Sequence, residues 1–262
     1  MKFSVIGSGS KGNVTYLETK KTKLLIDCGL SYKQINVRLQ SHNLSLDNLD
    51  GILITHEHSD HVAGLNVLLK RHAPKVHMTK TTYESLKFRV KENLSKSLIS
   101  FITPHEKLII NDCEILPFSI SHDASDAVGY VIYAEGKKIV YITDIGYLPV
   151  KDFELLENAD AYVFESNYDI TMLFTSNRPF YLKQRIDSIK GHMSNNDSAY
   201  NMAKLVGDKT KQIVLAHPSR ECNTAKAAIS TFDEVFTEYG LKIKDFELVV
   251  ATQDIPTKIF EI

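Results

Sequence analysis

Thr55-His56-Glu57-His58-Ser59-Asp60-His61 is the stretch of this sequence that decides the fold. It follows the apolar run of residues 51–54 and precedes an apolar helical pattern that starts at Val62, so we expect a strand-to-helix turn here. Three imidazoles and two carboxylates within six residues are costly to crowd together unless something positive neutralises or coordinates them. A metal ion does both, and the stretch therefore predicts a metal site.

The order of the donors within this stretch indicates two ions. Alternate residues of a turn project to a common side, so His56 and His58 can share one ion, while Asp60 and His61 lie on the next curve of the chain and can reach a second. The zinc signature His-Glu-x-x-His does not fit, because Asp60 stands where the second histidine would be. A solvated polar loop with chance histidines is the alternative interpretation.

The composition favours one folded chain without a global basic field. With 262 residues, of which 43% are hydrophobic, the chain can fill a substantial core. The net charge of -1 means that any site for a polyanion must be local. The longest candidate is the basic stretch of residues 80–96, which is either a solvated helix face or a rim that faces the substrate.

The cysteines and the apolar runs predict a cytoplasmic protein. Three cysteines, Cys28, Cys113 and Cys222, are too few for a disulfide framework in a chain of this size, and a reducing compartment fits best. The first residues carry only a short apolar run, which is not typical of a secretory signal. No window approaches the roughly 18 to 20 apolar residues that span a bilayer, so we expect no membrane partner.

Strand-like and helical patterns alternate unevenly along the chain. Short runs rich in β-branched and aromatic residues predict strands at residues 3–6, 14–18, 23–27, 51–54, 107–110, 114–119, 129–134, 138–142, 162–165 and 212–216. Apolar periodicity predicts helices at residues 62–71, 81–93, 181–189, 195–206 and 224–239. The segment 167–179 has the weakest pattern and is expected to be a loop near the site. We predict mixed sheets covered by outer helices, in a single domain of residues 1–262.

The pattern His56-x-His58-x-Asp60-His61 resembles the signature of the metallo-β-lactamase superfamily. The resemblance implies an α/β (α+β) fold, an αββα sandwich of two mixed sheets with outer helices and a binuclear metal site at one edge. It covers nearly the whole chain, because the later motifs occur in order. They are the supporting acid Asp27, the third histidine His122, the bridging acid Asp144 and the last histidine His217.

The residues themselves agree with this assignment. His122, Asp144 and His217 each follow an apolar strand-like run, so they would emerge at one sheet edge. By the resemblance, the ligands divide between the ions as His56, His58, His122 and Asp144 for one, and Asp60, His61, Asp144 and His217 for the other. Imidazoles and carboxylates permit two divalent ions of zinc or manganese.

A second motif, Gly191-His192-Met193-Ser194, separates the branches of the superfamily. Ser194 is expected to be the N-cap of a helix, with Asp197 as its partner three residues on. His192 then lies at a helix N-terminus, where exposed N–H groups favour an anion such as a phosphate. The alternative is a histidine that only packs before the helix. Glu165, at the end of a predicted strand, either orients His192 or is a plain acid at the edge of the core.

Within the superfamily the chain resembles the YycJ/WalJ family of Gram-positive bacteria. The matching stretches are Gly7-Ser8-Gly9-Ser10-Lys11-Gly12-Asn13, Ser121-His122-Asp123-Ala124, Glu165-Ser166-Asn167-Tyr168-Asp169, Gly191-His192-Met193-Ser194-Asn195 and His217-Pro218-Ser219-Arg220-Glu221-Cys222-Asn223. The family usually has Leu and Asn where this chain has Pro218 and Cys222, so the shape of that loop is open. Candidate substrate contacts from these stretches are Ser8, Ser10, Asn13, Ser194, Ser219, Arg220 and Asn223.

The glycine spacing of residues 7–12 also matches a dinucleotide-binding motif, but weakly. The residues that follow are β-branched and aromatic where a dinucleotide-binding unit would begin a helix, so we expect a hairpin turn. This turn either is purely structural or borders the substrate.

The resemblance implies a binuclear-metal-dependent phosphodiesterase or nuclease, most specifically a 5′→3′ DNA exonuclease in which a metal-bound hydroxide attacks the phosphodiester. The expected catalytic residues are Asp60, which would orient the hydroxide, His192 on the leaving side, and Glu165 behind it. The alternatives are a small-molecule metallohydrolase acting on a cyclic phosphodiester or a thioester, and a regulatory protein with a relic site.

The low net charge is a mild objection to a DNA substrate. It would be met if basic residues gathered at the metal site, the candidates being Lys11, Arg178, Lys183, Arg185, Lys190 and Arg220. The large β-CASP insert of many nucleases in this superfamily is absent, because only residues 145–191 lie between Asp144 and His192. A chain end would therefore reach the site directly, which favours an exonuclease over internal cleavage.

Overall fold

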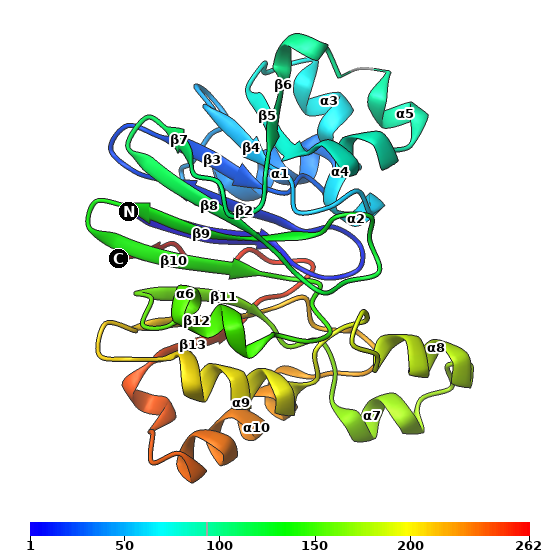
Figure 1. The fold of residues 1–262 in the computed structure, drawn as a ribbon, viewed down its shortest axis with the longest axis vertical. Helices are drawn as coiled ribbons and strands as arrows, with labels where there is room; N and C mark the ends of the chain where they lie inside the picture. The colour runs from blue at the N-terminus through cyan, green and yellow to red at the C-terminus, as the bar shows by residue number, and fades with distance from the viewer. Residues whose placement is uncertain (93) are drawn as a thin grey trace. The chain divides into compact units, whose positions relative to one another are not determined.

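The computed structural model describes residues 1–92 and 94–262, which form two compact units (Figure 1). Unit 1 comprises Met1–Ser119, Ala124–Gly136 and Thr252–Ile262, and unit 2 comprises Ile120–Asp123 and Lys137–Ala251. That the two units fold as one domain, as the sequence predicts, stays a prediction. None of the helices formed by the described residues has the length and apolar character that crossing a bilayer requires.

Unit 1 is built on a mixed sheet. In spatial order its strands are β14 (Phe260–Glu261), β1 (Lys2–Gly7), β2 (Val14–Glu18), β3 (Lys23–Ile26), β4 (Gly51–Leu53), β5 (Lys75–Thr79) and β6 (Ile99–Ile102). Neighbouring strands from β14 to β3 run antiparallel, and those from β3 to β6 run parallel. The parallel strands bring the carboxyl ends of β3 and β4 to one edge, where the chain turns into the residues around Asp27 and His56.

A second group of strands in unit 1 forms an antiparallel meander of β7 (Leu108–Ile110), β8 (Cys113–Ser119) and β9 (Val128–Ala134). Two hydrogen bonds tie β9 to the chain after β4. The Tyr130 hydroxyl donates to the Ile54 carbonyl oxygen over 2.6 Å, and the Val128 amide donates to the Thr55 carbonyl oxygen over 3.0 Å. The start of the histidine cluster is therefore held from two layers of unit 1.

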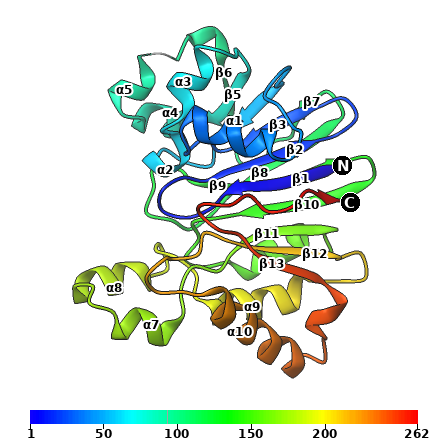
Figure 2. The same ribbon diagram turned by 180° about the vertical axis from the view of Figure 1, so that it is seen from behind.

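The helices of unit 1 are α1 (Tyr32–Gln40), α2 (Ser59–Val62), α3 (Leu65–Leu69), α4 (Lys80–Ser85) and α5 (Phe88–Lys91). The view from behind shows α1 lying against the sheet (Figure 2). Ile35 of α1 and Leu68 of α3 pack in one buried cluster with Ile52 of β4. Burying these apolar side chains is the main favourable term that holds the helices to the sheet.

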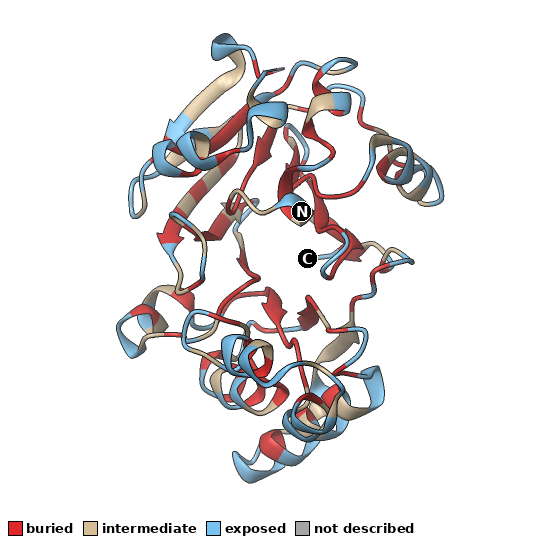
Figure 3. Ribbon diagram, turned by 90° about the vertical axis from the view of Figure 1, so that its right-hand side faces the viewer, coloured by how far each residue is buried: buried red, intermediate tan, exposed pale blue. Residues whose placement is uncertain are grey.

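Unit 2 contains four parallel strands among its described residues, β10 (Lys137–Ile142), β11 (Ala161–Glu165), β12 (Gln212–Ala216) and β13 (Glu247–Val250). Its helices are α6 (Phe153–Leu156), α7 (Ile170–Thr175), α8 (Phe180–Ile186), α9 (Asn195–Leu205) and α10 (Ala225–Glu238). The long helices α9 and α10 lie side by side in both ribbon views (Figures 1 and 2). The strands are mostly buried, whereas the outer faces of the helices are exposed (Figure 3).

All of the strands predicted from the sequence are present, with ends that differ by a residue or two. The strands β5, β6, β13 and β14 and the helices α1 and α6 were not predicted. Strand β5 does not show an alternation of apolar and polar residues that matches its burial. His77 is polar and yet buried, like its apolar neighbours Val76 and Met78. Helix α1 escapes because only Ile35 and Leu39 of its nine residues are buried.

Three of the sequence predictions need correction. The helix predicted at residues 62–71 begins earlier, with α2, and is interrupted before α3, where a Cβ on Gly64 would lie 2.1 Å from the Leu30 carbonyl oxygen. The helix predicted at residues 81–93 breaks at Leu86 into α4 and α5, and its last residue, Asn93, lies outside the described residues. The loop predicted at residues 167–179 is wrong, because it contains α7, whose N-cap Asp169 accepts from the Met172 amide.

Candidate metal centre

The histidine cluster of unit 1 lies in the turn between β4 and α2, as the sequence predicts. His58 is the N-cap residue of α2, and His56 and His61 are fully buried. The ring centroid of His56 lies 4.6 Å from that of His58 and 4.0 Å from that of His61. Buried imidazoles this close to one another are suited to binding a cation that shares their lone pairs.

Asp27 supports the cluster through hydrogen bonds. Its carboxylate is fully buried and accepts from His61 Nδ1 over 2.8 Å and from the Thr55 amide over 2.9 Å. Burial raises the pKa of Asp27, and the adjacent His61 opposes this shift. Since a carboxylate can only accept, His61 carries its proton on Nδ1 and keeps the Nε2 lone pair, the form in which histidine binds a metal.

The turn of residues 7–13 supports the same cluster. The Asn13 amide donates to the Asp60 carbonyl oxygen over 2.7 Å, and its side-chain Nδ2 lies 3.1 Å from His61 Nε2 and 3.3 Å from an Asp60 carboxylate oxygen. Asn13 Oδ1 in turn accepts from the Gly9 amide and from the Ser8 hydroxyl. The turn joins two strands, as expected, and not a strand and a helix.

A second group of donors lies in unit 2, at the ends of its strands and just before α9. Asp144, Glu165, His192 and His217 each offer a ligand atom, and these atoms all lie within 4.8 Å of one another. One Asp144 carboxylate oxygen is 3.5 Å from His217 Nδ1, 3.7 Å from His192 Nδ1 and 3.8 Å from His122 Nε2. His122 and His217 are thus brought beside Asp144, as the order of these three residues along the sequence predicts.

Glu165 lies at the end of β11 and is fully buried between two of these histidines. Its Oε1 accepts from His192 Nδ1 over 2.8 Å and from His217 Nδ1 over 3.1 Å, while Oε2 accepts from the Ile145 amide. Burial raises the pKa of Glu165, but the charge and the hydrogen bonds of His192 and His217 outweigh it and hold the pKa below its usual value. The predicted contact between Glu165 and His192 is therefore present.

His122 is held in the orientation of a ligand. Its Nδ1 donates to the Gly191 carbonyl oxygen over 3.1 Å, which leaves Nε2 on the side of Asp144. Burial lowers the pKa of His122, although Asp144 raises it. A neutral imidazole with a fixed tautomer is the state that coordinates a metal.

Three of these residues adopt the left-handed backbone conformation that non-glycine residues usually avoid. The φ angles are 60° at Asp27, 59° at Asp144 and 55° at His217. All three positions come immediately or shortly after the ends of strands β3, β10 and β12. Strain of this kind, of order 1–3 kcal/mol per residue, is retained where the surrounding structure fixes a functional side chain.

Most of the candidate substrate contacts make hydrogen bonds to other groups of the protein. Ser194 is the N-cap of α9 and bonds to Asp197, as predicted. The Asn223 side chain is buried and donates to the carbonyl oxygens of Ser166 and Asn167. Ser219 accepts from the Cys222 amide, whereas Arg220 and Ser10 are exposed. Contact of any of these residues with a substrate stays a prediction.

The basic residues proposed to attract DNA need a correction. The Lys183 side chain is largely buried and donates to the carbonyl oxygens of Phe174 and Ser176, so it is not available to a phosphate. Arg178 pairs with Glu221 over 2.9 Å, and Arg185 pairs with Asp123 over 2.5 Å. These three side chains are thus already paired with groups of the protein.

Sequence reasoning missed two residues of the site. Thr55 donates through its amide and its hydroxyl to Asp27, and the only signal in the sequence is its place directly before the histidine cluster. Asn167 Nδ2 donates to the His217 carbonyl oxygen over 2.6 Å. Cys222, which stands where the family usually has Asn, packs in an apolar cluster with Tyr168 and Leu173.

Comparison with known proteins now decides the family. The family model described as the β-lactamase superfamily domain matches residues 22–217, which include every proposed metal ligand. An exodeoxyribonuclease YycJ of Bacillus anthracis is 36% identical over 99% of this chain and 98% of its own. The exodeoxyribonuclease WalJ of Streptococcus pneumoniae is 37% identical over 100% of this chain and 98% of its own. The chain belongs to the YycJ/WalJ family of the metallo-β-lactamase superfamily.

Solved structures agree on the fold of this YycJ/WalJ-family chain. The metallo-β-lactamase fold protein YhfI from Bacillus subtilis aligns with a TM-score of 0.74 at 17% identity, covering 99% of each chain. The short form of human tRNase Z aligns with a TM-score of 0.67 at 17% identity, covering 100% of each chain. The predicted fold class is thereby confirmed, and the chain is a hydrolase of the metallo-β-lactamase superfamily.

Proposed function

We propose that this protein is a metal-dependent exodeoxyribonuclease that digests DNA from the 5′ end. The observation that carries the proposal is the buried Glu165 carboxylate that fixes His192 and His217 beside Asp144, in a chain whose full-length relatives are named exodeoxyribonucleases. The fold alone would not choose the substrate, because unrelated activities share it.

Two divalent ions fit the donor set. By the pattern of the superfamily, His56, His58, His122 and Asp144 would hold one ion, and Asp60, His61, Asp144 and His217 the other. The support from this structure is that His61 and His122 each have Nδ1 bonded to an acceptor, which directs Nε2 toward a ligand position. Imidazole and carboxylate ligands permit zinc or manganese. When bound, such ions lower the pKa of a coordinated water to about 7 and neutralise charge on a phosphoryl group.

The chain's own residues supply the rest of the chemistry. His192 donates from Nδ1 to Glu165, so its Nε2 is the ring atom that is left to face a substrate, and the side chain is 23% exposed. We assign it to the leaving oxygen, where a positioned imidazole stabilises developing negative charge or transfers a proton. Asp60, whose side chain is 21% exposed, would orient the attacking water.

The segment between Asp144 and His192 favours an exonuclease over an internal nuclease. This segment holds a 3₁₀ helix at Val150–Asp152 followed by α6, β11, α7 and α8, and none of these is an added domain that would enclose a strand. A DNA end can then enter without threading. The DNA substrate also agrees with the cytoplasmic location predicted from the sequence, since the relatives are bacterial proteins.

The test is digestion of end-labelled polymers by the metal-loaded protein. Single- and double-stranded DNA and RNA, labelled at either end, are incubated with the protein and with an Asp144→Ala control. We expect mononucleotides from the 5′ end of DNA, and no product from the control. Turnover of a cyclic phosphodiester or a thioester without shortening of any polymer would instead support the small-molecule hydrolase, and the nuclease proposal would be wrong.

A further inference from the structure

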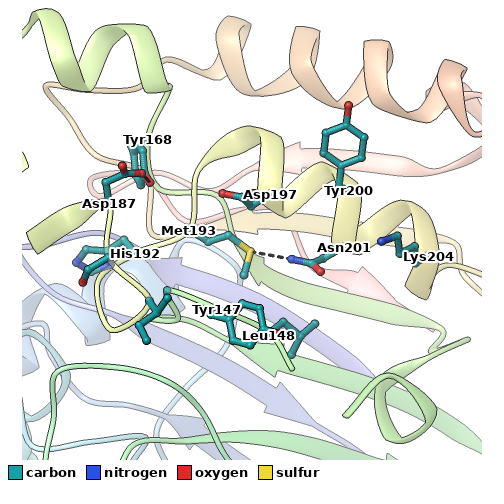
Figure 4. A pocket seen from close by; sticks show the side chains of 13 residues that line it. Tyr147, Leu148, Tyr168, Asp187, His192, Met193, Asp197, Tyr200, Asn201 and Lys204 are labelled. Atoms are coloured by element: carbon teal, nitrogen blue, oxygen red, sulfur yellow. Dashed lines mark hydrogen bonds between the residues drawn. The ribbon is translucent and has the colours of Figure 1, made fainter. Parts of the chain in front are cut away.

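A pocket of about 370 Å³ lies in unit 2 beside His192 (Figure 4). One wall comes from the loop after β10, with Tyr147 and Leu148, and the opposite wall comes from α9. Three of the α9 residues that line it are four and then three positions apart, so they share one face of the helix; they are Asp197, Asn201 and Lys204. His192 and Met193 lie at the end where α9 begins.

The loop wall is apolar and offers one aromatic ring. Leu148 is buried, whereas the Tyr147 residue is 51% exposed, so its ring is accessible. The Tyr200 ring, in contrast, points away from the pocket toward α10, where its hydroxyl donates to Glu238 over 3.0 Å (Figure 4). Tyr168 also lines the pocket, but it is only 2% exposed. Tyr147 is therefore the accessible aromatic ring in this pocket that can stack on a planar ligand.

The charges in the pocket favour an uncharged group over a phosphate. Asp187 and Asp197 contribute two carboxylates, against the single ammonium group of Lys204. The Tyr168 hydroxyl donates to Asp187 over 2.5 Å and the Ser194 hydroxyl donates to Asp197 over 2.7 Å, so both acids are held in place. A surplus of negative charge repels an anion, and phosphate is thus a poor occupant.

Asn201 suits the edge of a nucleobase. Its side-chain amide has both a donor and an acceptor, and its contact with Met193 Sδ, at 3.5 Å, is a weak one that a stronger acceptor can replace. A planar ring with hydrogen-bonding edges, stacked on Tyr147, matches these features together. The size of the pocket lies near the lower end of the range for small-molecule sites, which fits one nucleoside.

We propose that this pocket binds the base of the 5′-terminal nucleotide of the DNA; this rests on the proposed function. Hydrolysis forms a bond from the water oxygen to phosphorus and breaks the bond from phosphorus to O3′, whose electron pair stays on O3′ and takes up a proton. The leaving O3′ belongs to the nucleotide on the 5′ side of the scissile phosphate. Since His192 serves the leaving oxygen and also lines the pocket, that nucleotide is the one beside it.

Gly146 permits the wall to form. A Cβ at this position would lie 2.4 Å from the Ser188 carbonyl oxygen, so the loop that carries Tyr147 can approach residues 188–189 only with glycine here. Ser188 and Ile189 belong to the lining as well. The pocket is thus enclosed by two loops and a helix of unit 2.

The test compares two DNA strands that differ only in the base of the first nucleotide, which one strand lacks. We expect kcat/KM of the wild-type protein for release of that first nucleotide to fall roughly 5- to 150-fold when the base is missing, the equivalent of one stacked base. Tyr147→Ala should lower kcat/KM for the intact DNA by a similar factor. It should also show little difference in kcat/KM between the two strands. Tyr147→Phe, which keeps the ring, should restore the wild-type preference.

Tyr181→Ala is the matched control, because Tyr181 is another exposed tyrosine of unit 2 that does not line the pocket. It should keep the wild-type ratio between the two strands. Equal digestion of both strands by the wild-type protein, or an unchanged ratio in Tyr147→Ala, would overturn the pocket proposal while leaving the exonuclease proposal intact. Failure to digest either strand would overturn the exonuclease proposal, and the pocket proposal with it.

Discussion

Oε1 of Glu165 accepts a hydrogen bond from Nδ1 of His192 over 2.8 Å. Because the carboxylate is fully buried, this bond is shielded from water and fixes both the tautomer and the direction of the ring. The sequence places the two residues 27 positions apart, and strand β11 and the loop before α9 bring them together.

Replacing Glu165 by Gln should therefore impair turnover more than substrate binding. The amide keeps the shape of the side chain but loses the charge that holds the imidazole, and we expect kcat to fall about 10- to 100-fold with a smaller change in KM. The measurement is steady-state release of 5′ nucleotides over a range of pH. Glu154→Gln, an exposed position on α6, is the control. A variant with wild-type kcat and pH profile would show that the contact with His192 has no catalytic role.

Metal removal should inactivate the protein and destabilise it. Dialysis against a chelator takes away the cations that offset clustered imidazoles and carboxylates, so we expect activity to be lost and the melting temperature to fall. Adding zinc or manganese should restore both. Elemental analysis should give two ions per chain for the wild-type protein and fewer for Asp144→Ala. Full occupancy in that variant would contradict the proposed bridging role of Asp144.

Asp27→Asn should weaken metal binding, although Asp27 is not itself a proposed ligand. The new amide brings an N–H group against the donors Thr55 and His61, so at least one buried hydrogen bond is lost, at a cost of about 1.5–3 kcal/mol. We also expect metal affinity to fall about 10- to 100-fold, measured by competition with a chelating dye. Asp47→Asn, at an exposed position, should change neither quantity. Unchanged affinity in the Asp27 variant would mean that it supports the fold alone.

The sequence predicted the site residues that follow strands better than the hydrogen bonds that orient these residues. His56, Asp144 and His217 are identifiable because an apolar run precedes each one and marks a strand end. Thr55 and Asn167 were missed because their roles depend on hydrogen bonds between segments far apart in the chain. No periodicity in a sequence encodes such bonds.

Lys183 shows the opposite error. A lysine near other basic residues indicates a surface for anions, but this side chain is buried, with its ammonium group capping carbonyl oxygens at the end of α7. Likewise, α7 was missed because its six residues include a single fully buried apolar position, Leu173, which gives no helical period to detect. Tertiary packing, which the sequence pattern does not show, decided both cases.

His77 should make unit 1 sensitive to mild acid. Burial, with a smaller effect of Lys75, lowers the pKa of His77 to about 4 from its usual 6.5. The unfolded chain therefore binds the proton more readily than the folded one, and the free energy of unfolding should fall as the pH drops from about 6.5 toward 4, by up to about 3 kcal/mol.

The measurement for His77 is urea unfolding between pH 7.5 and pH 4.5. His77→Gln removes the titrating group, so its stability should depend less steeply on pH than that of the wild-type protein. His105→Asn, at an exposed position, should keep the wild-type slope. Equal slopes for His77→Gln and the wild-type protein would assign the acid sensitivity to other groups.

Gly29 should be indispensable to the geometry of the turn between β4 and α2, which carries the histidine cluster. A Cβ there would lie 1.5 Å from the Asp60 carbonyl oxygen and 2.8 Å from the Asn13 amide, which donates to that same oxygen. Gly29→Ala must therefore push Asp60 away from the cluster, and we expect a loss of about 1–3 kcal/mol or more in the free energy of unfolding together with weaker metal binding. Gly136→Asn is the control, since a side chain at Gly136 meets open space and Asn tolerates its positive φ. Wild-type metal affinity in Gly29→Ala would show that Asp60 keeps its position without this close contact, and the role given to Gly29 would then be wrong.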